Sequence, residues 1–229
     1  MNARPQIFFQ ILVATLLSLA AVDYVSAGDF PGGKPDRRII KTQEKVDDLF
    51  EKGDFERAYF IYREELVPLG DKFAQYMVGY MHVAGKGTEQ DYIAGSAWYR
   101  LAAERGGEHY SKARDELLGH FNEEQLLRSN QKYTDLRLLY SDAMIICRLI
   151  EEDLEIAASR VPGSKLAYRP TDVTSINNAE RARLAEDAIE RIETRLVYLR
   201  AVLGSNAPMS DEEIIRIERV EQEAARAIQ

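Results

Sequence analysis

Apolar side chains recur at helical spacing along most of the chain. From about residue 38 to residue 125 they return every three or four residues, in segments separated by breaks at Gly53-Asp54, Gly70-Asp71, Gly85-Lys86-Gly87 and Gly106-Gly107. This spacing places apolar side chains on one face of an α-helix, and a glycine followed by an aspartate is typical of one helix ending and the next beginning. The pattern predicts an all-α structure made of short helices.

The helix predicted after Gly70-Asp71 is apolar on two sides. One stripe contains Ala74, Met77, Val78 and Met81, and the other contains Phe73, Tyr76, Tyr80 and Val83. Such a helix must contact neighbours on both sides, which is how helices stack in repeat proteins.

The last third of the chain shows heptad spacing. Residues 123–160 contain no glycine or proline, and their apolar positions are three or four residues apart. After a proline-containing loop at residues 161–175, a second helix carries a regular seam formed by Ala182, Ala185, Ile189, Ile192, Leu196, Leu199 and Leu203. Gly204 ends this helix, and a last helix follows Pro208. Two long helices joined by one loop predict an antiparallel hairpin with the last helix alongside. The heptads also permit a homodimer, but pairing within a monomer is favoured because the two seams have similar lengths.

Residues 1–27 have the pattern of a secretory signal peptide. Arg4 gives a positive start, an apolar run follows at residues 7–22, and small residues at 25–27 offer a cleavage site. The run is shorter than the roughly 20 residues that span a bilayer as a helix. An uncleaved amino-terminal anchor is the alternative, and a lipoprotein is excluded because no cysteine follows the run. Residues 28–36 read as a flexible leader, so we expect an exported, periplasmic protein without stable membrane insertion after cleavage.

Charge and cysteine content narrow the class of function. The chain has 38 acidic and 30 basic residues and a formal net charge of −8, which disfavours nucleic-acid binding because phosphates require basic side chains. Cys147 is the single cysteine and the three histidines are scattered, so no metal site and no cofactor is expected. Nucleophile elbows, phosphate loops and metalloprotease motifs are absent.

The middle of the chain resembles a known repeat. Residues 74–106 read AQYMVGYMHVAGKGTEQDYIAGSAWYRLAAERG, and this stretch resembles a Sel1-like repeat, a family of all-helical solenoids related to tetratricopeptide repeats. The matching positions are Ala74, Gly79, Gly85, Gly87, Asp91, Tyr92, Trp98, Tyr99, Ala102, Ala103, Glu104 and Gly106. The chain departs from the pattern at Val78, His82 and Gly95, and Gly95 is expected to loosen its helix by about 1 kcal/mol relative to alanine.

The resemblance extends more weakly to both sides. Residues 53–71 are similar to the second helix of a preceding repeat, with one residue extra before Gly70, and the segment that contains Ala113, Leu117 and Phe121 is similar to the first helix of an incomplete following repeat. Asn122 with Gln125 predicts a capping box for the next helix. We therefore expect a short Sel1-like solenoid at residues 37–122 and a helical hairpin domain at residues 123–229.

The residues that could perform chemistry have structural interpretations. His82, His109 and His120 are expected on helix faces or in turns, and Cys147 is expected to be a buried small hydrophobe. The acidic runs at residues 151–153 and 211–213 are expected to be solvated or to oppose a helix dipole. No catalytic residue is therefore assigned.

Tyr76 and Tyr80 are the candidate binding residues. They lie one turn apart on the first helix of the repeat, the side that lines the concave face in such solenoids, and exposed tyrosines there would anchor a peptide or a partner helix. Packing against the adjacent helices is the alternative.

The resemblance implies a non-enzymatic adaptor that binds another protein, in envelope regulation or assembly. Two alternatives belong to other classes: an enzyme that acts on envelope polysaccharide or peptidoglycan, and a structural coiled-coil dimer.

Overall fold

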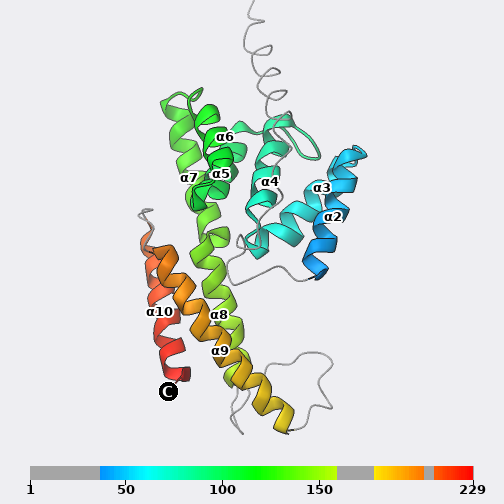
Figure 1. Ribbon diagram of the computed structural model, residues 1–229. Helices are drawn as coiled ribbons and strands as arrows, with labels where there is room; N and C mark the ends of the chain where they lie inside the picture. Colours follow the sequence, from blue (N-terminus) through cyan, green and yellow to red (C-terminus); the bar gives the residue numbers. More distant parts are fainter. Residues whose placement is uncertain (1–36, 159–177, 204–208, 229) are drawn as a thin grey trace, which may run out of the picture. The chain divides into compact units, whose positions relative to one another are not determined.

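The computed structural model describes residues 37–158, 178–203 and 209–228. These residues form helices and the short turns between them, with no strand in these ranges, so the all-α class is confirmed (Figure 1). The predicted signal peptide, the leader and the whole of the predicted loop at residues 161–175 lie outside the described residues. No helix in the described ranges is long and apolar enough to cross a membrane.

The chain divides into two compact units, Met1–Ser141 (unit 1) and Asp142–Gln229 (unit 2). The division follows the helix at Glu123–Tyr140, whereas the boundary predicted from the sequence precedes it. This helix groups with unit 1 because it packs along a helix of that unit.

Unit 1 is a succession of short helices. They are α2 (Arg37–Glu51), α3 (Phe55–Phe60), the π-helical turn η1 (Ile61–Leu66), the 3-10 turn η2 (Val67–Leu69), α4 (Lys72–Ala84), α5 (Tyr92–Ala102), the 3-10 turn η3 (Ala103–Arg105), α6 (Glu108–Leu118) and α7 (Glu123–Tyr140). Asp71 and Asp91 cap α4 and α5, since their carboxylates accept the backbone N–H groups of Ala74 and Ala94 at 3.0 and 2.9 Å. The predicted capping box at the start of α7 is confirmed.

The segment before Gly70 contains a π-helical turn. An α-helix begins at Phe55 and continues as the π turn η1, whose wider turn holds more residues than an α turn. Gly70 then ends the segment in the left-handed conformation at φ 80°.

The close crossing of α4 and α5 depends on two glycines. A Cβ on Gly79 would lie 2.7 Å from the Tyr99 ring and 3.1 Å from the Gly95 carbonyl oxygen. A Cβ on Gly95 would lie 2.6 Å from a methyl group of Val83 and 3.0 Å from the Gly79 carbonyl oxygen. Gly95 therefore permits close contact between the two backbones, and this explains its presence better than the loosening expected from helix propensity.

Helix α5 packs between α4 and α7 and fixes the register of the unit. The hydroxyl groups of Ser96 and Ser129 lie 2.8 Å apart, and both side chains are buried. One turn later on both helices the Arg100 guanidinium lies over the Tyr133 ring, so the two helices run in the same direction. Trp98 and Tyr99 fill the space on either side of α5 and are 2% and 1% exposed.

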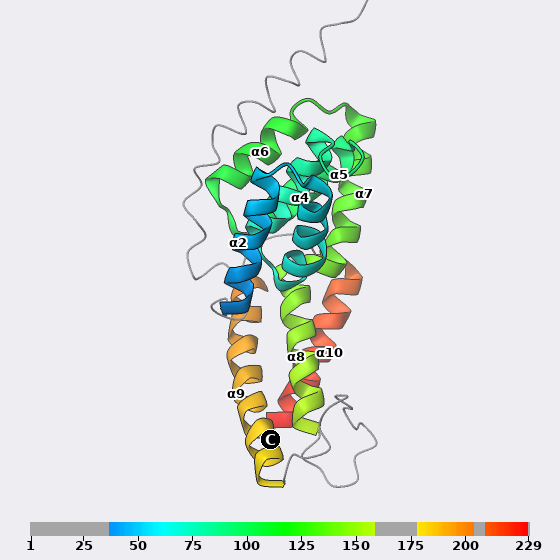
Figure 2. The same ribbon diagram turned by 90° about the vertical axis from the view of Figure 1, so that its right-hand side faces the viewer.

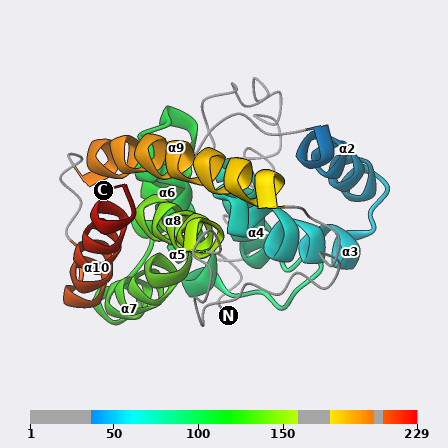
Figure 3. The same cartoon turned by 90° about the horizontal axis from the view of Figure 1, so that it is seen from below.

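Unit 2 has its own aliphatic core. It contains α8 (Asp142–Ala158), α9 (Asn178–Leu203) and α10 (Asp211–Ile228), and α9 and α10 flank α8 on two sides (Figures 2 and 3). The buried core side chains include Ile146, Ile150, Ile192, Leu196, Leu199, Ile217 and Val220.

The first predicted long helix is two helices. The sequence predicts one helix through residues 123–160, but α7 ends at Tyr140 and α8 begins at Asp142. Ser141 has extended backbone angles, φ −64° and ψ 154°. Serine followed by an acidic residue favours a helix start over continuation, and this signal was masked by the apolar spacing that runs across it.

Candidate interaction site

The structure places the two predicted binding residues in the interior of unit 1. Tyr76 and Tyr80 are 5% and 3% exposed. The Tyr76 ring stacks on Tyr99 with centroids 5.2 Å apart and meets the His109 ring at 4.8 Å. Tyr80 packs against Phe50. Both tyrosines therefore contribute to helix packing, and they lack the exposure that surface anchors require.

Burial also determines the protonation of this aromatic cluster. Burial, assisted by nearby Tyr80, Tyr110 and Glu116, raises the pKa of the Tyr76 hydroxyl far above its usual value, and burial does the same for the pKa of Tyr99. These phenols stay protonated, so they supply neither a base nor a nucleophile.

The histidines and the cysteine do not gather into one site. Burial lowers the pKa of His82, whose Nε2 lies 3.1 Å from the Tyr59 hydroxyl, and burial also lowers the pKa of His109. In unit 2, burial raises the pKa of the Cys147 thiol to about 12, so this thiol is protonated at neutral pH. Nowhere in the described ranges do three histidine, cysteine or acidic side chains gather as metal ligands.

The acidic run at residues 151–153 is only partly a solvated face. Asp153 is buried and binds Arg191 and Arg195. Burial alone would raise the pKa of Glu151, but hydrogen bonds and charges from Arg216 and Arg219 outweigh it and lower that pKa. These carboxylates therefore bind helices of unit 2 to one another.

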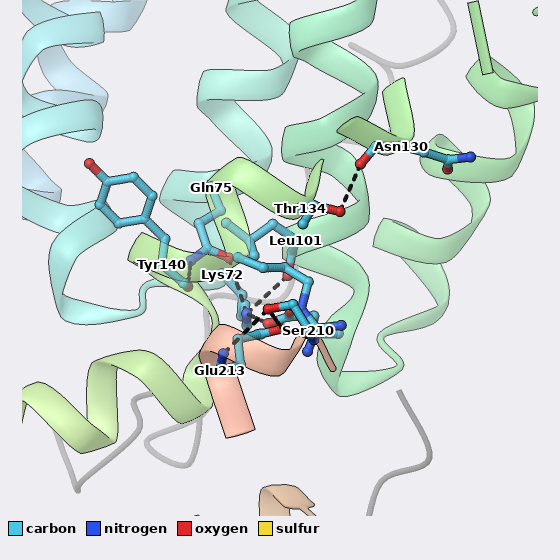
Figure 4. Close-up of polar contacts among 10 residues, drawn as sticks. Lys72, Gln75, Leu101, Asn130, Thr134, Tyr140, Ser210 and Glu213 are labelled. Carbon is cyan, nitrogen blue, oxygen red and sulfur yellow. Dashed lines mark hydrogen bonds and ion pairs between the residues drawn. The ribbon is translucent and has the colours of Figure 1, made fainter. Parts of the chain in front are cut away.

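A buried lysine joins α4 to α5 in unit 1. The Lys72 ammonium donates to Gln75 Oε1 at 3.1 Å and to the Leu101 carbonyl oxygen at 2.9 Å, and it pairs with Glu104 at 3.0 Å (Figure 4). Gln75 in turn donates to the Tyr140 carbonyl oxygen at 3.1 Å. Every member has a partner, so this network stabilises the helix ends and offers no vacant group.

A cleft of 550 Å³ opens between two turns of unit 1. It is lined by Gly53, Asp54, Phe55, Glu56, Gly85, Gly87, Thr88 and Glu89. The ammonium of Lys86 lies 4.6 Å from the Phe55 ring centroid and also faces Phe50 and Tyr80. The rings stabilise this cation. The charged side chains that line the cleft itself are acidic, and one of them, Asp54, is paired with Arg57.

The surface of α5 and α7 carries an unusual arginine. Arg100 is half-buried, its guanidinium carbon lies 4.1 Å from the centroid of the Tyr133 ring, and its Nη1 donates to Asn130 Oδ1 at 2.6 Å. No carboxylate among the described residues contacts Arg100. We call Arg100, Asn130 and Tyr133 the arginine site.

Other arginines contribute positive charge at the arginine site, although each of them is itself paired with a carboxylate. Burial lowers the pKa of Arg100 first, Tyr133 opposes this, and the charges of Arg114 and Arg137 lower it further. Arginines from α5, α6 and α7 thus act on one another within an otherwise acidic protein. A half-buried cation in such a field is stabilised by an anion, which the site can accept.

Sequence reasoning missed this site. Residues 92–102 contain a single charged side chain, Arg100, in a helix that otherwise consists of apolar and small residues, Tyr92 and Tyr99 included. A lone charge in a buried helix is a signal for a partner or a ligand, and it was available in the sequence. Comparison of the chain with protein-family models, with curated proteins and with solved structures found no match.

Proposed function

We propose that the protein is an exported, non-enzymatic adaptor of the Sel1-like repeat type, which binds another protein through unit 1. The observation that carries this proposal is a constant spacing between helices that contact each other. Tyr76 of α4 contacts His109 of α6, and Ser96 of α5 contacts Ser129 of α7, in each case 33 residues further along the chain. Helices repeated at one period and stacked in one direction are the defining feature of a solenoid.

The residues of the Sel1-like resemblance support the same interpretation. Gly79 allows α4 and α5 to approach, Gly85 and Gly87 have left-handed backbone angles in the turn between them, and Asp91 caps α5. The motif positions therefore perform packing roles. Helices α6 and α7 both pack on α5, which extends the stack of helices beyond the α4–α5 pair.

A solenoid with these features binds proteins through its exposed side chains. The core of unit 1 is closed, because its largest aromatic residues are buried against one another. Where α5 contacts α7, the partly exposed groups of the arginine site are those that we propose unit 1 offers to a partner.

For unit 2 we propose an intramolecular hairpin formed by α8 and α9. Arg191 binds Asp153, while Arg195, one turn later, reaches back to the Leu149 carbonyl oxygen at 2.6 Å. Contacts further along α9 fall on earlier residues of α8, so the two helices run antiparallel. We propose that the heptad seam predicted in the sequence pairs within one chain. This supports a monomer.

Site-specific photocrosslinking in cells tests the adaptor. The full chain would carry a photoreactive residue at Lys132 on α7 or, as the control, at Glu193 on α9; both positions are exposed. We expect one defined protein adduct from Lys132 and none from Glu193. Adducts from Glu193 alone would overturn the role of unit 1, and an adduct between two copies of the chain would favour the structural dimer. Turnover of peptidoglycan or polysaccharide by the purified protein would overturn the non-enzymatic assignment.

Export has a separate test. Cell fractionation followed by amino-terminal sequencing should find the protein in the periplasm with Gly28 as its first residue. A membrane-bound chain that retains Met1 would support the uncleaved anchor.

A further inference from the structure

We propose that the arginine site is the receptor for a carboxylate group of the partner protein. This inference rests on the adaptor function proposed above and specifies its chemistry. The Nε–H and Nη2–H edge of Arg100 would hold the two carboxylate oxygens, while Asn130 and Tyr133 hold the guanidinium in place.

The same edge binds carboxylates elsewhere in this chain. Arg114 uses Nε and Nη2 to bind Asp115 at 2.7 and 3.0 Å, and Arg216 uses the same two nitrogens to bind Glu151 at 3.3 and 2.6 Å. Arg191 uses them to bind Asp153. Arg100 commits Nη1 to Asn130, and no described residue occupies its Nε and Nη2 edge. The Nε and Nη2 edges of these arginines therefore bind carboxylates within the chain, and we propose that the same edge of Arg100 binds a carboxylate of another molecule.

The guanidinium of Arg100 is positioned before a ligand arrives. Stacking on Tyr133 fixes the plane of the group, and the short hydrogen bond to Asn130 fixes its rotation. The Ser96–Ser129 contact one turn earlier sets the register of α5 against α7, so the three residues of the site meet. Preorganisation of this kind reduces the conformational entropy lost on binding.

Charge and geometry favour a carboxylate. The carboxylates beside the neighbouring arginines and lysine are committed to other pairs, because Asp115 binds Arg114 and Glu104 binds Lys72 and Arg137. Two parallel N–H groups match the two oxygens of a planar carboxylate, which an aspartate or glutamate side chain or a chain terminus can supply.

Small probes test the chemistry without knowledge of the partner. The Nε–H resonance of Arg100 would be followed by NMR in the chain from Gly28, which contains every described helix. N-acetylglycine represents a chain terminus, acetylated and amidated aspartate represents a side chain, and N-acetylglycinamide is the neutral control. We expect one or both carboxylates to shift the resonance in a saturable way and the neutral amide to leave it unchanged. The Nε–H resonances of Arg114 and Arg191, whose edges are occupied, should not move.

Variants separate this inference from the adaptor function. The variants are followed at the side-chain amide resonance of Asn130, which all of them keep. Arg100→Gln should weaken carboxylate binding about tenfold or more, the loss expected for a charged hydrogen-bonded pair, and Arg100→Lys should also weaken it because lysine lacks the two-nitrogen edge. Arg128 is exposed on α7, and Arg128→Gln removes the same positive charge outside the arginine site, so this variant should bind as the wild type does. Inorganic phosphate is added as a separate probe for other anions. A shift caused by phosphate only, equal shifts with the neutral amide, or unchanged binding in Arg100→Gln would overturn the carboxylate receptor. If Arg100→Gln still crosslinks to the partner at the wild-type level, the adaptor function stands and this inference fails. If the probes bind but no partner is crosslinked, the receptor chemistry stands and the adaptor function fails.

Discussion

The two units hold their helices together in different ways. In unit 1 the helices approach closely because Gly79 and Gly95 have no side chains, and aromatic rings fill the wider gaps. In unit 2 the described core is aliphatic, and its helices are spaced by leucine and isoleucine side chains along a seam. Unit 1 should therefore be sensitive to added atoms, and unit 2 should be sensitive to atoms removed.

The two units also differ in how they place charged side chains. Unit 1 buries one lysine that meets three acceptors, and it leaves Arg100 at the surface without a carboxylate. In unit 2, Asp153 and Glu151 each bind two arginines of neighbouring helices. Ion pairs between helices of unit 2 therefore reinforce packing, whereas the arginine site of unit 1 remains available for binding.

The largest expected effect is the loss of volume from the seam of unit 2. Ile192 is fully buried between α8 and α9. Replacement by alanine removes apolar contacts and leaves a cavity, so Ile192→Ala should lower the free energy of unfolding by about 4 kcal/mol. Val197 on the same helix is 66% exposed, and Val197→Ala should change the free energy by less than about 0.5 kcal/mol. Chemical denaturation measures both, and equal losses would contradict the assignment of the seam as a core.

An added methyl group tests the close packing of unit 1. Gly87 has φ +70°, and a Cβ there would lie 2.2 Å from the backbone carbonyl oxygen of Phe55. Gly106 has a similar φ of +75°, with nothing within 4 Å of the added atom. Gly106→Ala should cost about 1 kcal/mol for the left-handed backbone, and Gly87→Ala should cost about 3 kcal/mol because a backbone clash is added. Thermal or denaturant unfolding compares them, and a difference below experimental error would show that the turn moves away easily.

The third effect sets helix propensity against packing. Alanine is intrinsically better than glycine in a helix by about 1 kcal/mol, so an isolated helix would be stabilised by Gly95→Ala. In this structure the new methyl group meets Val83, and Gly95→Ala should be destabilising by about 1 kcal/mol overall. The double variant Val83→Ala/Gly95→Ala should lose less stability than the sum of the single variants, which a double-mutant cycle measures. Stabilisation by Gly95→Ala alone would contradict the role of this glycine.

Much of the fold could be predicted because turns and caps are local. Glycine with aspartate marked the starts of α3, α4 and α5, and the capping box at Asn122 marked the start of α7. The break at Ser141 was missed because no glycine or proline accompanies it, and the apolar spacing continues through it. The grouping of α7 with unit 1 depends on contacts such as Ser96 with Ser129, which no local pattern reveals.

The candidate site was harder to predict for the same reason. Tyrosine spacing correctly placed Tyr76 and Tyr80 on one helix face, but it could not distinguish a face covered by α2 and α6 from an exposed one. Arg100 becomes a candidate binding residue only through its contacts with Asn130 and Tyr133, which lie about one repeat further along the chain. The arginine site therefore forms only when α5 packs against α7, and the sequence showed only the single charged side chain of α5.

The smallest effect concerns the buried cap of α4 and changes sign with pH. Burial raises the pKa of Asp71 despite hydrogen bonds from Ala74 N–H and the Gln43 side chain. The folded state then holds a proton more tightly than the unfolded state, so the contribution of Asp71 to stability falls as pH rises from its ordinary pKa, about 3.9, through the raised folded value. Asparagine keeps the cap acceptor without a charge, so Asp71→Asn should be within about 1 kcal/mol of the wild type. Relative to the wild type, the variant should be most stable at neutral pH and lose that advantage on acidification. Denaturation of both proteins between pH 3 and pH 7 measures this, and Asp91→Asn, at the exposed cap of α5, is the matched control. A wild-type protein that gained stability relative to Asp71→Asn as pH rose would show that the hydrogen bonds outweigh burial. The interior of unit 1 would then hold a buried carboxylate charge as unit 2 holds Asp153 beside two arginines.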